Sequence, residues 1–244
     1  MPDRLREQEN ETLQNMLLGD YVPAAIADAR RRQDEFMMQR FANQPLRIAD
    51  IGSGDGYHGT MFAPGCKLYH GYEIAPALIK LTRERWAKAG LDNATVFEGD
   101  VATADLPAEF YDLAICMYFT PGNFRDVQSD WTFYTDGYLD HNPVFIRIMS
   151  SFYRALKPGG QMYLTVYRDV PEAEAAQRDF YSTTGHPPVT PAGSRFVATA
   201  DAFWSARWTK KSMLSNLADC EIVSQQVRFH ELNAIAWLVE INKK

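Results

Sequence analysis

The stretch DIGSGDG, from Asp50 to Gly56, decides the fold of this 244-residue chain. An apolar run at residues 46–49 comes before it, and residues 57–62 after it can form a helix. This order predicts a buried strand, a sharp turn and the start of a helix. The glycines remove every Cβ from the inside of the turn, so a ligand can lie against peptide N–H groups at the positive end of the helix. We therefore expect a nucleotide-like ligand at the first crossover of an open α/β sheet.

The charge at the tip of the first strand favours one class of nucleotide. Residues 54–59 fit the dinucleotide pattern GxGxxG, but in that fold the first glycine follows the strand at once, and here Gly52 does so. Asp50 lies where a pyrophosphate would rest, and a carboxylate there is electrostatically unfavourable. It suits a ligand that carries an ammonium or sulfonium group. A dehydrogenase is therefore the last of the alternatives.

Further motifs follow in a regular order. A second predicted strand, residues 67–72, ends in Glu73, where a carboxylate can accept both ribose hydroxyls. A third, residues 94–97, leads to Asp100. A fourth, residues 112–117, opens onto the sequence YFTPGNF, and the turn LKPGG precedes a fifth at residues 161–167.

Together these motifs resemble the class I S-adenosylmethionine (SAM) dependent methyltransferases, and the resemblance covers about residues 45–167. It implies an α/β, Rossmann-like fold with a seven-stranded, mostly parallel sheet, a C-terminal antiparallel hairpin and N-terminal helices. Strands at residues 221–229 and 234–241 would form the hairpin. It also implies SAM as the cofactor. The cofactor-binding residues that follow from the motifs are Asp50, Gly52, Ser53, Gly54, Gly56, Glu73, Ile74, Asp100, Val101, Cys116 and Met117.

A finer resemblance lies ahead of the first strand. Residues 28–36, DARRRQDEF, are similar to a stretch of the glycine and sarcosine N-methyltransferases. That similarity implies that Arg32 reaches the methionine carboxylate of SAM and that Arg168 binds the carboxylate of the acceptor. The alternative is that Arg30 to Arg32 form a solvated helix face. YFTPGNF replaces the glycine-specific sequence of that family, so we expect an acceptor other than glycine.

The segment at residues 118–142 interleaves aromatic and acidic residues. Aromatic faces can solvate a sulfonium or ammonium group, and carboxylates can attract a cationic amine. The alternative is a lid whose aromatics pack on the sheet and whose acids face water. The predicted catalytic residues are Tyr118, Asn123 and His141, the last as a base or simply a loop residue near a helix start. The predicted substrate-binding residues are Phe124, Trp131, Tyr134, Tyr167 and Arg168.

The spacing of apolar residues predicts that the chain has two structural parts. Helices at residues 3–18 and 23–41 would form an N-terminal helical cap, residues 1–44. Residues 45–244 would form the SAM-binding domain, with lid segments at 118–142 and 168–208. Further helices are expected at residues 75–89, 143–156, 172–181 and 210–218.

Composition excludes several classes of function. The net charge is −6 and no basic cluster exceeds Arg30 to Arg32, so a nucleic-acid partner is disfavoured. The three cysteines are scattered, which fits a reducing cytoplasm and no zinc site. No metal-ligand pattern, signal peptide or membrane span is visible. We expect a cytoplasmic monomer or homodimer that acts on a small molecule, with no metal.

Three functions remain open. The first is methyl transfer to an amine or amino-acid-like acceptor, favoured over a hydroxyl because a deprotonated amine offers a free lone pair, whereas an alcohol needs a base. The second is cyclisation of SAM to azetidine-2-carboxylate and methylthioadenosine, as in the methyltransferase-like synthases of secondary metabolism that this chain also resembles. The third is a non-catalytic SAM-binding subunit.

Overall fold

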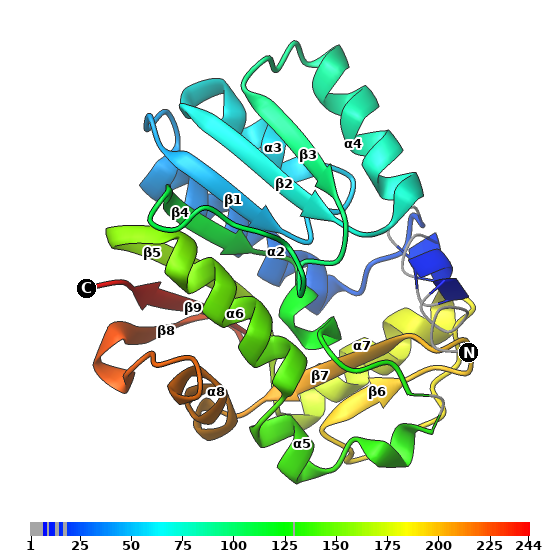
Figure 1. The fold of residues 1–244 in the computed structure, drawn as a ribbon. Helices are drawn as coiled ribbons and strands as arrows, with labels where there is room; N and C mark the ends of the chain where they lie inside the picture. Colours follow the sequence, from blue (N-terminus) through cyan, green and yellow to red (C-terminus); the bar gives the residue numbers. More distant parts are fainter. Residues whose placement is uncertain (1–6, 9, 13–14, 17–18, 129) are drawn as a thin grey trace.

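A computed structural model describes residues 7, 8, 10–12, 15, 16, 19–128 and 130–244 (Figure 1). The described residues form one sheet of nine strands. The strands are β1 (Arg47–Ile51), β2 (Leu68–Glu73), β3 (Ala94–Glu98), β4 (Tyr111–Cys116), β5 (Leu156–Arg168), β6 (Phe196–Ala198), β7 (Trp204–Trp208), β8 (Val227–Asn233) and β9 (Ala236–Asn242). The α/β class that the motifs predict is confirmed.

The order in which strands are added to the sheet reverses at β1. Its order is β3-β2-β1-β4-β5, all parallel, and β9 then pairs antiparallel with β5 over Gln161–Tyr167. β8 completes the predicted hairpin on the outer side of β9. The chain leaves β1 for β2 on one side, whereas β4 lies on the other, so a crevice opens above the carboxyl end of β1.

Helices cover both faces of the sheet (Figure 1). One apolar cluster unites one face with side chains of α6 (Pro143–Ala155) and α8 (Lys210–Ala218). A second unites the other face with α2 (Ala24–Phe41), α3 (Tyr57–Phe62), α4 (Pro76–Lys88) and α7 (Pro171–Thr183). A short helix α5 (Asp136–Asp140) precedes α6. Most residues of β1, β2, β4 and β5 are thus buried, whereas β3 at the edge of the sheet is largely exposed.

The strand count differs from the seven that the family resemblance implies. β7 extends the sheet by pairing parallel with the last two residues of β5, and β6 pairs antiparallel with β7. All five residues of β7 are buried, although its sequence WSARW alternates apolar and polar residues as a half-exposed strand does. The segment at residues 168–208 therefore holds two strands as well as α7.

Two other expectations differ in detail. The strand predicted at residues 221–229 begins only at Val227, because Glu221 has a left-handed φ of 62° and Ser224–Gln226 form a 3-10 turn. In the helix predicted at residues 3–18, residues 7, 8, 10–12, 15 and 16 are helical, and the remainder lies outside the described residues. Met16 is buried in the second apolar cluster.

α2 is packed into the body of the fold. Ile26, Ala29 and Met37 lie in the second apolar cluster together with residues of β1, β4 and β5. The side chain of Asn233, at the end of β8, donates a hydrogen bond to the carbonyl of Ala25 at 2.8 Å. α2 is therefore held against the sheet over most of its length.

Candidate functional site

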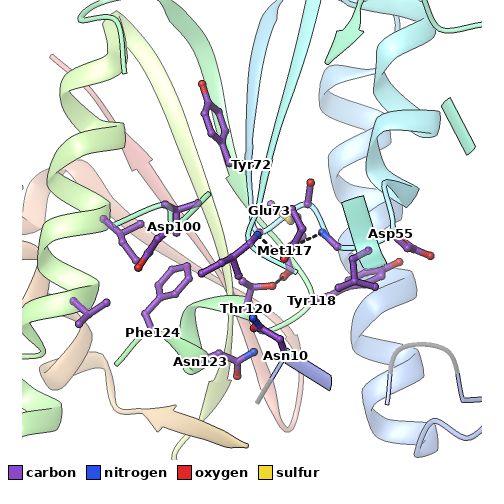
Figure 2. A pocket seen from close by; sticks show the side chains of 18 of the residues that line it. Asn10, Asp55, Tyr72, Glu73, Asp100, Met117, Tyr118, Thr120, Asn123 and Phe124 are labelled. Atoms are coloured by element: carbon purple, nitrogen blue, oxygen red, sulfur yellow. Dashed lines mark hydrogen bonds between the residues drawn. The ribbon is translucent and has the colours of Figure 1, made fainter. Parts of the chain in front are cut away.

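A cleft lies above the carboxyl ends of β1, β2 and β4 (Figure 2). It encloses about 1220 Å³ including its open mouth. The predicted site residues that line it are Gly52, Ser53, Gly54, Glu73, Ile74, Asp100, Val101, Met117, Tyr118, Asn123 and Phe124.

The glycine turn presents bare backbone to the cleft. Gly54 has a φ of +58°, and a Cβ added there would meet no protein atom within 4 Å. Gly52 has a φ of +71°, and a Cβ there would lie 2.6 Å from Cγ2 of Thr120. The turn therefore needs glycine for its left-handed backbone at both positions, and at Gly54 the space that a side chain would fill belongs to the cleft.

Glu73 is the carboxylate that β2 delivers to this cleft. Its Oε2 accepts a hydrogen bond from the N–H of Gly54 at 2.8 Å, and its Oε1 accepts from the N–H groups of Ile74 and Ala75 at 2.9 Å. Only 5% of the residue is exposed. Burial raises the pKa of its carboxyl group, and the three N–H donors oppose that rise. Glu73 is thus fixed in one orientation before any ligand arrives.

Three predicted cofactor residues lie behind the cleft. Asp50 is buried, accepts a hydrogen bond from the hydroxyl of Tyr69 at 2.6 Å and does not line the cleft. Burial raises the pKa of its carboxyl group. Cys116 is buried, and Gly56 serves as the left-handed N-cap of α3. None of these three residues lines the cleft.

Tyr118 occupies an unusual backbone conformation. It has a φ of 52°, and Phe119 after it has a φ of 69°, so two consecutive aromatic residues are left-handed. The hydroxyl of Tyr118 donates to Oδ2 of Asp34 on α2 at 2.6 Å. Burial, followed by this hydrogen bond, raises the pKa of the Tyr118 phenol. Strained aromatic residues of this kind cluster at functional sites.

Asn123 and Phe124 follow in a short 3-10 turn, Thr120–Asn123. The side chain of Asn142 donates to the carbonyl of Phe124 at 2.6 Å and also caps α6. Figure 2 shows Asn123 beside Asn10 and Phe124 facing the Asp100 side of the cleft. The turn therefore supplies one amide and one aromatic ring to the same cavity.

Other predicted residues do not line the cleft. His141 is exposed and pairs with Asp219 through its Nδ1 at 2.7 Å, because it ends α5 on the outer side of the helical layer. Arg168 turns towards the β8–β9 hairpin, where it pairs with Glu231 at 3.0 Å and lies over the ring of Trp237. Neither His141 nor Arg168 therefore lies against the cleft, where a base or a carboxylate ligand was expected.

Three predicted aromatic residues have packing roles. Tyr167 stacks on Phe119 with ring centroids 3.7 Å apart. Tyr134 is buried against Phe196 and Trp204. Trp131 packs on the first apolar cluster. None of the three lines the cleft, so the alternative in which the aromatics of residues 118–142 pack on the fold describes Trp131 and Tyr134 correctly.

On α2 it is Arg30, and not Arg32 as the family resemblance implies, that lies beside a cleft residue. The Arg32 side chain is 53% exposed and pairs with Asp28 at 2.9 Å. Arg30 instead lies with its guanidinium carbon 4.8 Å from the ring centroid of Tyr118, and its Nε is buried with no hydrogen-bond partner. Arg30 neighbours the buried stripe of Ile26 and Gln33, which explains the difference.

Several lining residues were missed by sequence reasoning. Asp55, Tyr57 and His58 belong to the glycine turn and its helix, and their position alone could have marked them. Phe203 and Asn10 reach the cleft from segments distant in the sequence, which no local pattern reveals. The full set is Asn10, Asp55, Tyr57, His58, Tyr72, Leu78, Thr120, Arg125, Val127, Val144, Ile148 and Phe203.

Metal and membrane features were also sought. Within the described part of the chain, no group of three or more His, Cys, Asp or Glu side chains is arranged to hold a metal ion. No helix among those same residues combines the length and the hydropathy needed to cross a membrane.

Comparison with known proteins adds to this geometry. A family model described as a methyltransferase domain matches residues 42–212, which is more than half of the chain. No curated protein is a significant match.

Solved structures share the fold at low sequence identity. A SAM-dependent methyltransferase from Methanosarcina mazei is 17% identical, with a TM-score of 0.57, over 85% of this chain and 96% of its own. One from Mesorhizobium loti is 17% identical, with a TM-score of 0.57, over 88% and 98%. The magnesium protoporphyrin IX methyltransferase of Synechocystis PCC 6803, solved with bound SAH, is 10% identical, with a TM-score of 0.59, over 100% and 98%.

Proposed function

We propose that this chain, which belongs to the methyltransferase-domain family, transfers the methyl group of SAM to an amine or amino-acid-like small molecule. It is a SAM-dependent methyltransferase. The acceptor class is the part we infer. The observation that carries the proposal is the pairing of an open glycine turn at Gly54 with a buried, pre-oriented carboxylate at Glu73.

The nucleoside end of the cofactor fits the inner part of the cleft. Glu73 would hold the ribose hydroxyls, and Asp100 the adenine amino group, with Ile74 and Val101 against the faces of the base. Val144 and Ile148 of α6 line this side as well. A hydrophobic slot with two carboxylates at its ends suits an adenosine group, whose neutral, planar base carries an amino donor at one end and whose ribose carries hydroxyl donors at the other.

The amino-acid end of the cofactor would lie towards α2. We propose that Arg30, rather than Arg32, binds the methionine carboxylate, since its buried Nε has no partner. A guanidinium group forms charge-assisted hydrogen bonds with a carboxylate. Tyr118, whose ring lies under Arg30, lines the cleft at this end.

The acceptor would enter on the opposite side of Met117. The residues that line this part are Asn10, Asn123, Phe124, Arg125, Val127 and Phe203. None of these described residues is an acid or a histidine, so they offer amide groups, a guanidinium group and apolar surface but no general base. An amine needs no base once it is deprotonated, whereas an alcohol does, and an amide oxygen accepts a hydrogen bond from an amine N–H.

Two segments would close over the reacting groups. Phe124 and Val127 come from residues 118–142, and Phe203 from residues 168–208. We propose that these segments act as lids that exclude water. When bound, the sulfonium centre supplies an already electrophilic methyl group, so the task of the chain is to place the acceptor lone pair in line and about 3 Å away.

The test is product analysis with methyl-labelled SAM and a panel of small amines, amino acids and matched alcohols. Label in an amine, together with S-adenosylhomocysteine (SAH), supports the proposal. Label only in an alcohol would overturn the acceptor class. Methylthioadenosine formed from SAM alone, above the spontaneous background, would instead identify the cyclisation reaction. Binding of SAM without any product would indicate a non-catalytic subunit.

A further inference from the structure

Gln33 is a buried amide at the centre of α2 with no role in the proposed chemistry. It is 0% exposed. Its Oε1 accepts hydrogen bonds from the backbone N–H of Tyr118 at 3.2 Å and from Oγ1 of Thr165 at 2.6 Å. Its Nε2 donates to Oδ1 of Asp34 at 2.9 Å and lies 3.2 Å from Nε2 of His58. Both lone-pair sites and both N–H groups of the amide are thus used.

This arrangement fixes the orientation of its neighbours. Nε2 of His58 lies 3.2 Å from the amide nitrogen of Gln33 and 3.4 Å from Oδ1 of Asp34. His58 and Tyr118 both line the cleft, and their rings pack edge to face with centroids 4.6 Å apart. One buried side chain on α2 therefore contacts two cleft residues that come from different crossovers of the sheet.

The backbone that Gln33 contacts is strained. Left-handed φ values, as at Tyr118 and Phe119, are energetically unfavourable for residues other than glycine. Such a conformation persists only where its surroundings compensate. Three contacts do so here: Gln33 holds the N–H of Tyr118, Asp34 holds its hydroxyl, and Tyr167 stacks on Phe119.

We propose that Gln33 is a positioning residue, whose amide holds Tyr118 in its left-handed conformation and thereby shapes the amino-acid end of the cofactor site. The inference rests on the proposed function for the identity of the ligand. Through the contact between Gln33 and Tyr118, α2 helps to shape the site. A substitution of Gln33 would therefore affect ligand binding only through Tyr118 and its neighbours.

The experiment compares three variants. Gln33→Met keeps the length of the side chain and removes every hydrogen bond. Gln33→Glu keeps an oxygen for Tyr118 and Thr165, and it protects the test if the Met variant fails to fold. Thr165→Val is the matched control, because it removes a donor to the same oxygen without touching Tyr118. Calorimetry measures the affinity for SAH, and NMR of ring-labelled tyrosine, assigned with Tyr118→Phe, reports the position of Tyr118.

We expect Gln33→Met to weaken SAH binding at least 10-fold and to shift or broaden the Tyr118 resonance. Thr165→Val should stay within about 3-fold of the wild type. Gln33→Glu keeps the oxygen that faces Tyr118 but sets a second oxygen against Oδ1 of Asp34, so it should leave the Tyr118 resonance in place. In a Tyr118→Gly background, where glycine adopts the left-handed φ unaided, Gln33→Met should add less than 2-fold. If the two effects multiply instead, Gln33 has only a structural role and the inference is wrong.

An unchanged Tyr118 resonance in folded Gln33→Met also overturns the inference. The NMR measurement needs no ligand, so it separates the two claims. If the wild type fails to bind SAH, the proposed function fails, while the Tyr118 resonance still decides whether Gln33 positions that residue.

Discussion

Oε2 of Glu73 accepts a hydrogen bond from the backbone N–H of Gly54 at 2.8 Å. The last residue of β2 is thus tied to the turn that follows β1. Because both groups line the cleft, the acidic side chain and the bare backbone are fixed relative to each other before a ligand binds. A site organised in advance loses less conformational entropy on binding.

Glu73→Gln should weaken the affinity for SAH by about 10- to 100-fold. The substitution keeps the shape of the side chain but removes the charge from its hydrogen bonds, which are worth about 1.5–3 kcal/mol with a charged partner. Glu98→Gln is the matched control, since Glu98 is the register partner of Glu73 on β3 and does not line the cleft. Calorimetry checks both. Equal losses in the two variants would contradict the assignment.

Affinity for SAH should fall in mild acid. Burial raises the pKa of Glu73 above the ordinary value of 4.5. Ribose hydroxyls donate to the ionised carboxylate, so binding is lost as the pH falls through the raised pKa, which places the onset above pH 4.5. Titrations from about pH 7.5 downwards, with folding checked by circular dichroism, measure this effect. Glu73→Gln should flatten the profile, and parallel profiles would assign the effect to another group such as Asp50, whose pKa is also raised.

Gly54→Ala and Gly159→Ala should separate backbone strain from ligand contact. Both glycines have a left-handed φ, and a Cβ at either meets no protein atom within 4 Å. Each substitution should therefore lower the free energy of unfolding by about 1 kcal/mol. Only Gly54→Ala should weaken SAH binding, by 10-fold or more, because its methyl group enters the cleft. Denaturant titration and calorimetry test the two parts, and undiminished binding by Gly54→Ala would show that the ligand does not approach this turn.

Arg30→Gln should weaken the affinity for SAH by about 10- to 100-fold, with little effect from Arg32→Gln. Arg32 is exposed and pairs with Asp28, and such surface pairs contribute about 0–1 kcal/mol. Methylthioadenosine lacks the amino-acid group, so Arg30→Gln should leave its affinity unchanged. A comparable loss for both ligands would place Arg30 away from the carboxylate.

Much of the fold could be predicted because its elements carry local signals. The glycine turn, the acidic residues after β2 and β3, and the alternation in β9 each identify an element within a few residues. β6 and β7 could not be found in this way. β6 has three residues and β7 five, too few for a periodic pattern to stand out, and the pairing of β7 with the end of β5 is a contact between residues about 40 positions apart.

The site was predictable where strands deliver residues directly. Glu73, Asp100, Tyr118 and Asn123 follow strand ends and line the cleft. His141 and Arg168 lie away from the cleft, because their sequence positions do not define where the side chain points. The same reason explains why Arg30 and not Arg32 lies beside Tyr118, since side chains two residues apart on a helix point to different sides of it.

β9 is an interior strand, paired with β5 on one side and β8 on the other, although it is the last strand along the chain. During synthesis on the ribosome, β5 therefore emerges long before its antiparallel neighbour and exposes an unpaired edge. Docking of β9 must come late, after the cleft-forming crossovers have been translated. A nascent chain that lacks this strand is the form of the protein most exposed to aggregation and to chaperone binding.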